Sequence, residues 1–374
     1  MTTRIPLGDL RREYRRLQAE IDEAIHRVLT RGWFVLGAEG EQFEAEWAEY
    51  CGVTQAVGVG NGTDALCLAL RAAGIGPGDE VIVPALTATF TALAVSMAGA
   101  TPVFADIDPT HYTLDPAALE AAITPQTAAV IPVHLYGCPA PMEPILDVAR
   151  RHGLFVLEDA AQAHGARYQE RRVGGWGDAA AFSFYPSKNL GAYGDAGAVV
   201  THDASLAGRV RMLRHGGQRA RYEHEQMGVN SRLDEIQAAI LRAKLPHLDA
   251  WNARRRALAE IYRAGLAGLA DLAGLALPTA PADAEPVHHL YVVRTETRDA
   301  LRHYLTGAGI ASDIHYPRPV HLQPAYAHLG YEPGSCPHAE SATSQILSLP
   351  IFPQLSRVEI EQTVRLIRFF FAMR

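Results

Sequence analysis

The stretch WGDAAAFSFYPSKNLGAYGDAGAVVT, residues 176–201, contains two short runs of small, aromatic and β-branched residues that predict strands at 180–184 and 197–200. The loop between them carries one lysine, Lys188, and three of the next nine residues are glycine. Most lysines in loops are solvated, but glycines let the backbone approach a ligand closely. A lysine amine in an apolar pocket has a lowered pKa and can act as a nucleophile or a base. Lys188 is therefore a candidate catalytic residue, with a solvated surface lysine as the alternative.

Strand-like and helix-like segments alternate on the N-terminal side of this stretch. Five further strands are expected at 55–59, 80–84, 102–106, 128–133 and 154–159. Helices are expected between them at about 63–73, 88–98, 115–123 and 141–152. This alternation predicts an α/β fold with a mainly parallel, seven-stranded sheet covered by helices on both faces. Ligands of such sheets bind beyond the carboxyl ends of the strands.

The two ends of the chain predict helices and a second domain. Apolar residues recur at steps of three and four over 9–30, which predicts an amphipathic helix, and a second helix follows the GWFVLG turn at 32–37. The pattern over 232–265 predicts long helices, followed by a Pro/Ala-rich loop and a mixed α/β segment. We expect a large domain over 1–245 and a smaller C-terminal α/β domain over 246–374.

Composition excludes several classes of protein. The 374 residues are 48% hydrophobic and 20% charged, with a formal net charge of −7, which argues against a nucleic-acid-binding surface. The four cysteines and the histidines show no metal-ligand spacing, so no metal site is expected. The N-terminus has no apolar signal region, and no apolar run reaches the roughly 18 residues of a membrane helix. We expect a cytoplasmic protein.

The segment GVGNGTDAL, 58–66, is a glycine turn that runs directly into a helix. Such a turn offers backbone N–H groups and the positive end of a helix dipole to a phosphate, with the Thr63 hydroxyl as a further donor. A plain helix cap is the alternative. A dinucleotide site is a poorer one, because the GxGxxG pattern needs glycine where Thr63 stands.

Two other segments supply polar groups. Asp159 ends the apolar run LFVLED, where an unpaired buried carboxylate would cost on the order of several kcal/mol, so it requires a cation. No Lys or Arg adjoins it, and a protonated pyridine nitrogen would serve. Gln162 and His164 follow it closely, although His164 could equally be a core histidine. Asn230 lies in a loop just before a long helix and, taken alone, is a capping or turn residue.

A phosphate cradle, an acid for a ring nitrogen and a lysine for an aldehyde together describe a site for pyridoxal 5′-phosphate. In this order, the motifs resemble the DegT-type (DegT/DnrJ/StrS) nucleotide-sugar aminotransferases, which have the aspartate-aminotransferase fold, fold type I. The resemblance covers nearly the whole chain, in GWFVLG, NGTDAL, GPGDEVIVPA, PVHLYG, EDAAQAHGA, FSFYPSKNLGAYGDAGAVVT, GVNSRLDEIQAA and the HYP of 315–317.

The resemblance implies a role for each of these residues. Lys188 would bond to the cofactor aldehyde and then carry a proton between the substrate and the cofactor. Asp159 would keep the pyridine nitrogen protonated, and Gln162 would hydrogen-bond the ring hydroxyl. Asn230 would reach the phosphate from the partner subunit of a homodimer with shared active sites. The remaining phosphate ligands would be Gly62, Thr63, Asp64 and Ser183.

The chain departs from the family at Ala88, where members commonly place an aromatic ring over the cofactor; Phe90 could substitute if the helix start shifts.

The resemblance places four residues near the sugar, namely Trp33, His315, Tyr316 and His321. It implies transfer of the amino group of L-glutamate, through pyridoxamine 5′-phosphate, to a nucleotide-linked keto-sugar. C3 of a dTDP-3-keto-6-deoxyhexose is expected, with UDP-4-keto sugars as the alternative.

Two related classes are weighed against an aminotransferase. Sugar dehydratases of this family carry histidine in place of the lysine, so Lys188 argues against them. A regulatory relative would not need the lysine, the glutamine and the phosphate ligands together, and all are present.

Overall fold

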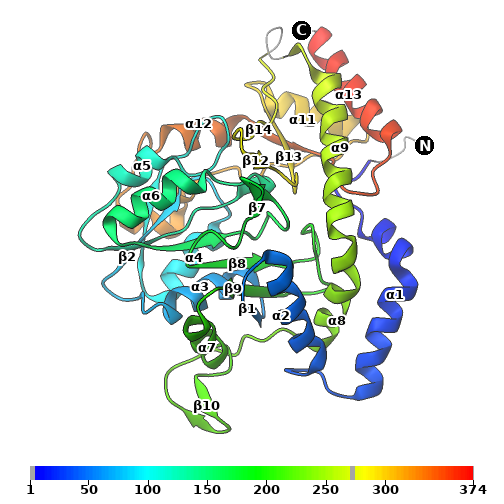
Figure 1. The fold of residues 1–374 in the computed structure, drawn as a ribbon. Coiled ribbons are helices and arrows are strands. Elements are labelled where there is room, and N and C mark those ends of the chain that lie inside the picture. Colours follow the sequence, from blue (N-terminus) through cyan, green and yellow to red (C-terminus); the bar gives the residue numbers. More distant parts are fainter. Residues whose placement is uncertain (1–4, 270–273, 374) are drawn as a thin grey trace.

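A seven-stranded sheet forms the centre of the computed structural model, which describes residues 5–269 and 274–373 (Figure 1). Its strands lie in the order β1-β9-β8-β5-β4-β2-β3. β9 is antiparallel to both neighbours, and all other pairs are parallel, so the predicted mainly parallel sheet is confirmed. The strands are β1 (Gln55–Val59), β2 (Glu80–Pro84), β3 (Thr101–Ala105), β4 (Thr127–Val130), β5 (Phe155–Asp159), β8 (Ala179–Ser183) and β9 (Gly197–Thr201).

One expected strand is shorter in the structure. The run predicted over 128–133 is a regular strand only to Val130, although Val133 still forms an isolated bridge to Asp159. Pro132 has no amide hydrogen to donate, so the hydrogen-bond ladder cannot continue through it. The chain leaves the sheet here, beside the end of β5.

Alternate side chains of the strands point to opposite faces, as a period of two requires. On one face, residues such as Val57 and Val199 pack under α3 (Gly62–Ala72), α4 (Thr89–Ala98) and α7 (Ala204–Leu213). On the other face, Phe182 and Val200 pack against α2 (Ala38–Cys51) and α8 (Glu235–Lys244). Ile82 and Val156 pack on that face against α5 (Pro116–Ala121) and α6 (Met142–His152). The result is three layers, with the sheet between helices.

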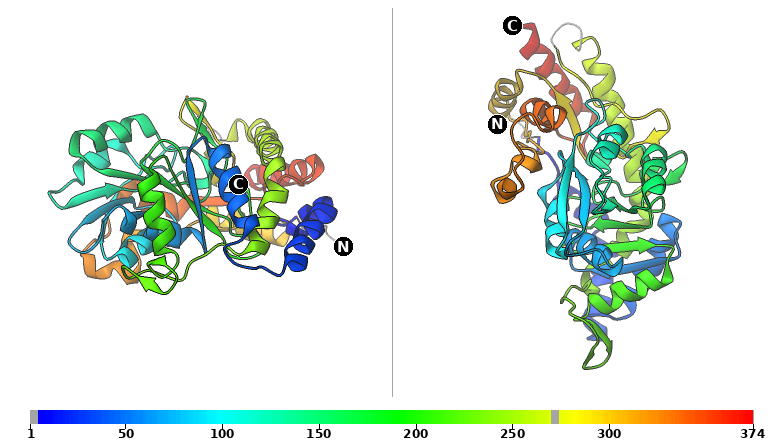
Figure 2. Two further views of the ribbon diagram at one scale, coloured as in Figure 1. Left: turned by 60° about the horizontal axis from the view of Figure 1, so that its bottom comes forward. Right: turned by 90° about the vertical axis from the view of Figure 1, so that its left-hand side faces the viewer.

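A separate apolar cluster lies in the C-terminal part of the chain, and Ile5 from the N-terminus joins it. The elements there are α9 (Leu248–Leu266), β13 (Tyr291–Arg294), α11 (Arg298–Gly307), α12 (Pro337–Gln345), β14 (Ile346–Leu349) and α13 (Arg357–Ala372). β13 and β14 pair antiparallel. α13 lies beside α9, and α1 (Leu10–Arg31) runs along α8 on the outside of the molecule (Figures 1 and 2).

Short elements complete the described chain. They are β6 (Arg167–Tyr168), β7 (Arg171–Arg172) and β12 (Ala284–Glu285) in one small sheet, β10 (Gln218–Ala220) and β11 (Glu223–His224) in a hairpin, and the 3-10 turns η1 (Leu135–Gly137), η2 (Leu245–His247), η3 (Val320–Leu322) and η4 (Pro324–Leu329).

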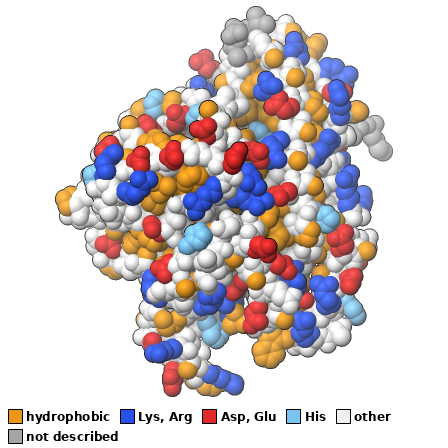
Figure 3. Space-filling model, viewed as in Figure 1, with side chains coloured by type: hydrophobic (Ala, Val, Ile, Leu, Met, Phe, Trp, Pro, Cys, Tyr) orange, Lys and Arg blue, Asp and Glu red, His pale blue; other side chains and the backbone are white. Residues whose placement is uncertain are grey.

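Figure 3 shows that acidic side chains lie close to the basic side chains that gather over β7 (Arg171–Arg172) on one face. Within residues 5–269 and 274–373, no helix has the length and hydrophobicity needed to cross a membrane.

Candidate active site

The polar groups singled out in the sequence meet at one edge of the sheet. Asp159 is the last residue of β5, the loop carrying Lys188 follows β8, and the 60–64 turn follows β1. These three strands run parallel, so their carboxyl ends share this edge.

The Lys188 side chain is half-buried on a closely fitted loop. The loop is closed by the hydrogen bonds Phe184 N–Ala196 O and Ala192 N–Phe184 O, both 2.8 Å. Burial lowers the pKa of Lys188 to about 8, against the opposing attraction of Asp159. With this pKa, roughly a fifth of the amine is neutral, and nucleophilic, at pH 7.4.

The chain has only one other lysine, Lys244. Its Nζ lies 2.6 Å from a Glu13 carboxylate oxygen, donates to Gly191 O at 2.7 Å and sits 4.0 Å from the centre of the Tyr193 ring. Lys244 thus stabilises the loop that carries Lys188, through its hydrogen bond to Gly191 O. This leaves Lys188 as the side-chain amine available at the sheet edge.

Asp159 is buried, and no Lys or Arg forms an ion pair with it in the described part of the chain. Its Oδ2 accepts the Thr91 hydroxyl at 2.8 Å, and its Oδ1 accepts the amide of Ala161 at 3.2 Å. Burial raises the pKa of Asp159, and these two hydrogen bonds oppose the rise. A carboxylate has about four acceptor positions, so it retains capacity for a cationic N–H donor.

The turn before α3 has the form of an anion cradle. Asn61 caps the helix, with its Oδ1 accepting the Asp64 amide at 2.8 Å. The Asp64 carboxylate accepts from Asn61 Nδ2 and Ser231 Oγ. For the amides of Gly62 and Thr63, by contrast, residues 5–269 and 274–373 supply no acceptor. Of the predicted phosphate ligands, Gly62 and Thr63 therefore offer free N–H groups, whereas the Asp64 amide is engaged.

Ser183 closes this cradle from β8. A Cβ on Gly62 would lie only 2.7 Å from the Ser183 Cβ, so the turn and the strand approach as closely as a glycine allows. The Ser183 hydroxyl accepts the amide of Tyr185 at 3.3 Å, which leaves its own hydrogen for another acceptor.

Gln162 connects the sheet edge to the C-terminal part of the chain. Its Oε1 accepts the Tyr136 amide at 2.7 Å, and its Nε2 donates to the Tyr316 hydroxyl at 3.1 Å. Burial raises the pKa of Tyr316 to about 12, so this hydroxyl stays protonated. His315 is held on the same segment by a 2.9 Å hydrogen bond to Ser348 Oγ, and burial lowers its pKa. The structure therefore brings Tyr316 to Gln162, and one Nε2 hydrogen of Gln162 remains free.

Other predicted residues lie apart from this group. Trp33 is exposed and donates to Leu36 O at 3.3 Å, and Asn230 is exposed next to the buried Ser231. His321 is buried, with Nε2 3.1 Å from a Glu340 oxygen and its ring beside Phe104 and Tyr331. In this chain His321 is a packed, paired side chain.

Ala88, Phe90 and His164 are the residues considered for the space around the cofactor ring. Ala88 precedes α4 directly, and Phe90 on the first turn of α4 is 63% exposed. His164 is fully buried against Trp47, Phe182 and Phe184, and burial lowers its pKa to about 3. It is a neutral core histidine.

Sequence reasoning missed Thr91 and Asn189. Thr91 lies one helical turn after Thr87, just beyond the end of β2, and that spacing was the available signal. Asn189, directly after the lysine, donates to Asn252 Oδ1 at 2.9 Å and to Val287 O at 3.1 Å. No local pattern indicates these distant partners.

Comparison with known proteins gives consistent results. The profile of the DegT/DnrJ/EryC1/StrS aminotransferase family matches residues 15–368. A dTDP-3-amino-3,4,6-trideoxy-alpha-D-glucose transaminase of Streptomyces venezuelae is 56% identical over 367 residues, 98% of this chain and 96% of the relative. A UDP-N-acetyl-3-dehydro-alpha-D-glucosamine 3-aminotransferase of Acidithiobacillus ferrooxidans is 50% identical over 366 residues, 98% of each chain.

The fold agrees equally well with a solved structure. The crystal structure of S. venezuelae DesV in complex with a ketimine intermediate superposes with a TM-score of 0.96, at 56% identity over 98% of each chain. These matches confirm both the predicted family resemblance and the predicted aminotransferase fold.

Proposed function

The chain belongs to the DegT/DnrJ/EryC1/StrS aminotransferase family, and from this premise we propose that it transfers the amino group of L-glutamate to C3 of a dTDP-linked 3-keto-6-deoxyhexose. The observation that carries the proposal is that Lys188, with a pKa of about 8, and the buried Asp159 lie at one sheet edge, and that no residue in 5–269 or 274–373 forms an ion pair with Asp159. An aminotransferase that uses pyridoxal 5′-phosphate requires this pair.

The residues at the sheet edge fit that cofactor. The free amides of Gly62 and Thr63 and the Ser183 hydroxyl suit its phosphate, and Asp159 suits a protonated ring nitrogen. The free Nε2 hydrogen of Gln162 suits the ring hydroxyl. When bound, the pyridine ring supplies an electron sink for the charge left when a proton leaves the substrate carbon. Ala88 would leave one face of the ring open, or let another group such as Phe90 cover it.

Each of these side chains has one task in the proposed reaction. Lys188 would bond to the cofactor aldehyde and, once the amino substrate has displaced it, would carry a proton between the substrate carbon and the aldehyde carbon of the cofactor. Asp159 would hold the proton on the ring nitrogen. Tyr136 and Tyr316 keep Gln162 oriented from two sides.

Trp33, His315 and Tyr316 are the proposed contacts for the sugar. Tyr316 and His315 are held near Gln162, and their polar atoms suit sugar hydroxyls. Trp33 lies exposed on the turn before α2 and offers an aromatic face. We do not assign a sugar contact to His321, because Glu340 and two aromatic rings already occupy its surroundings.

The relatives support the choice of carbon and of nucleotide. The names of both relatives place the amino group at C3, although one substrate carries dTDP and the other UDP. The greater identity to the dTDP enzyme favours dTDP, and the UDP sugar is the second candidate.

Domain division and assembly are further parts of the proposal. We place the boundary near residue 245, between α8 and α9, with Ile5 packed on the smaller, C-terminal domain. We also propose a homodimer in which Asn230 of one subunit reaches the phosphate site of the other. Its exposed position supports a role outside its own chain's core.

The substrate test uses the aminated form of the protein. It is prepared with L-glutamate, freed of excess amino acid, and mixed separately with dTDP-3-keto, dTDP-4-keto, UDP-3-keto and UDP-4-keto sugars. Return of the absorbance of the aldehyde form is expected fastest with the dTDP-3-keto sugar. Fastest return with a UDP sugar would replace the nucleotide, fastest return with a 4-keto sugar would replace the carbon, and return only with simple keto acids would remove the sugar.

A further inference from the structure

Two buried threonines stand behind Asp159. The Thr91 hydroxyl donates to Asp159 Oδ2 at 2.8 Å, and the Thr87 hydroxyl lies 3.0 Å from that of Thr91. Thr87 and Thr91 are 2% and 1% exposed, so water does not compete for these bonds. Both residues follow β2, on the turn into α4 and on its first turn.

The direction of these hydrogen bonds is linked to the charge on Asp159. An ionised carboxylate can only accept, so Thr91 must donate its single hydrogen to it. Thr87 must then donate to Thr91, and both hydrogens point toward Asp159. A protonated Asp159 would remove this requirement, because its own O–H could donate to Thr91.

From this geometry we infer that Thr91, oriented by Thr87, is a positioning residue that keeps Asp159 ionised, and thereby keeps the proton on the ring nitrogen of the cofactor. The inference rests on the proposed function, because it acts on the pyridine that Asp159 is proposed to bind. Thr91 itself does not touch the reacting atoms in this scheme.

The other groups around Asp159 contribute less than Thr91 to keeping the carboxylate ionised. Burial raises the pKa of Asp159, and the Thr91 hydroxyl is the foremost of the groups that oppose the rise, ahead of the Ala161 amide, Lys188 and His134. The help from Lys188 is lost once its amine is neutral. The Ala161 amide binds the other oxygen, at 3.2 Å.

A structural role is the competing explanation, since Thr91 also packs inside the helix layer. The two explanations differ in what happens to the proton. Without the Thr91 hydroxyl, the carboxylate becomes a stronger base, and the proton shared with the ring nitrogen moves toward Asp159. Loss of packing alone does not move it.

The test is the nitrogen-15 chemical shift of bound pyridoxal phosphate labelled at the ring nitrogen, which distinguishes a pyridinium from a neutral pyridine. Thr91→Val, which keeps the shape but lacks the hydroxyl, should reduce the ratio of ring-protonated to neutral form about tenfold or more. Thr91→Ser should restore the wild-type shift, and Thr87→Val should change the ratio less than about threefold. The turnover number should fall with Thr91→Val while KM for the sugar stays unchanged.

A wild-type shift in Thr91→Val, or the same altered shift in Thr91→Ser, would overturn the inference. If the valine variant does not fold, Thr91→Ala takes its place, with the same two outcomes. Failure of the proposed function is distinguishable, because the wild-type protein would then either bind no pyridoxal phosphate or show a neutral ring nitrogen.

Discussion

Lys188 and Lys244 show how position gives the same side chain two tasks. Lys244 is fully buried, and a carboxylate, a carbonyl oxygen and an aromatic ring surround its ammonium group. Lys188 is half-buried and has Asp159 as its nearby opposite charge, so burial dominates and its pKa falls to about 8. Only the second environment leaves an amine that can attack an aldehyde.

This difference predicts how the apoprotein captures pyridoxal phosphate. Below pH 8 most of the Lys188 amine is protonated and unreactive, so the capture rate should rise roughly tenfold per pH unit and level off above pH 8. Capture is measured by borohydride reduction, followed by peptide mass mapping. In Lys188→Ala, the peptide that contains position 188 should carry no label, and turnover should be lost. In Lys244→Arg, Lys188 should be labelled as in the wild type. Label on Lys244, or turnover by Lys188→Ala, would refute the assignment.

The sequence predicted those residues whose chemistry depends on local context. A carboxylate at the end of an apolar strand, and a lysine in a glycine-rich loop after another, are both visible in the chain itself. The threonine partner of Asp159 and the glutamate partner of His321 were not predicted, because α4 and α12 approach them only through packing. Long-range pairs of this kind have no signature in spacing.

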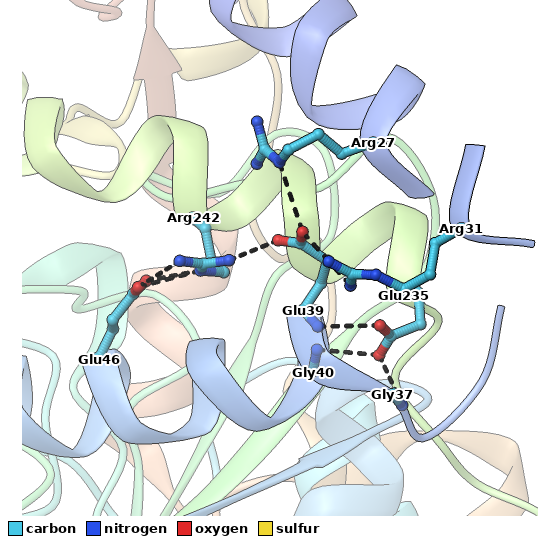
Figure 4. A network of polar contacts seen from close by, with 8 residues as sticks. All are labelled: Arg27, Arg31, Gly37, Glu39, Gly40, Glu46, Glu235 and Arg242. Carbon is cyan, nitrogen blue, oxygen red and sulfur yellow. Dashed lines mark hydrogen bonds and ion pairs between the residues drawn. The ribbon is translucent and has the colours of Figure 1, made fainter. Parts of the chain in front are cut away.

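At the scale of elements, the start of α2 depends on a carboxylate from a distant helix. Glu235 on α8 is fully buried and accepts the amides of Gly37, Glu39 and Gly40, each at 2.9 Å (Figure 4). These are unpaired donors at a helix N-terminus, where a negative charge is favourable. The same contact fixes the end of the exposed turn that carries Trp33.

A second layer of charge surrounds this cap. The buried Glu39 is paired with Arg27, Arg31 and Arg242, and Arg242 also binds Glu46 (Figure 4). The guanidinium groups come from α1 and α8, so the network joins three helices. Binary patterning predicts that α1 and α2 are amphipathic helices, but it does not predict this buried charge.

We expect Glu235→Gln to lower the free energy of unfolding by about 1–3 kcal/mol, because an amide keeps one oxygen acceptor and places an N–H group against an unpaired backbone donor. Urea unfolding of Glu235→Gln and of the wild type measures this loss of free energy. Glu46→Gln is the matched control: its side chain is 38% exposed, and its loss should cost about 1 kcal/mol or less. Equal losses in the two variants would show that the cap does not stabilise α2 through its three amides.

At the scale of the whole molecule, the order of strands and helices was predicted closely, since burial on both faces imposes a readable pattern on each parallel strand. The position of the N-terminus was not. The amide of Ile5 donates to Gly309 O and its carbonyl accepts the Ala311 amide, both at 2.9 Å, although these residues lie near the other end of the sequence. These hydrogen bonds form only when the C-terminal part folds back toward Ile5, and no local sequence pattern predicts that arrangement.

Asn230 is the residue through which the proposed dimer would contribute to the phosphate site. Its neighbour Ser231 is buried and contacts Gly60 and Asp64 of the same chain, so the segment lies beside the phosphate cradle. Asn230 itself is exposed. It is therefore accessible to a second subunit in the proposed dimer.

Mixing two impaired variants tests this arrangement. Asn230→Ala should weaken cofactor binding, and Lys188→Ala should abolish turnover. In a hybrid dimer, the site that uses Lys188 of the first variant would receive Asn230 from the second, so one intact site forms. Random exchange should restore about a quarter of the wild-type activity at limiting cofactor, since about half of the dimers are hybrids with one intact site in two. Differently tagged chains verify exchange. If tagged hybrids form and activity stays at the level of the parents, Asn230 acts within its own subunit.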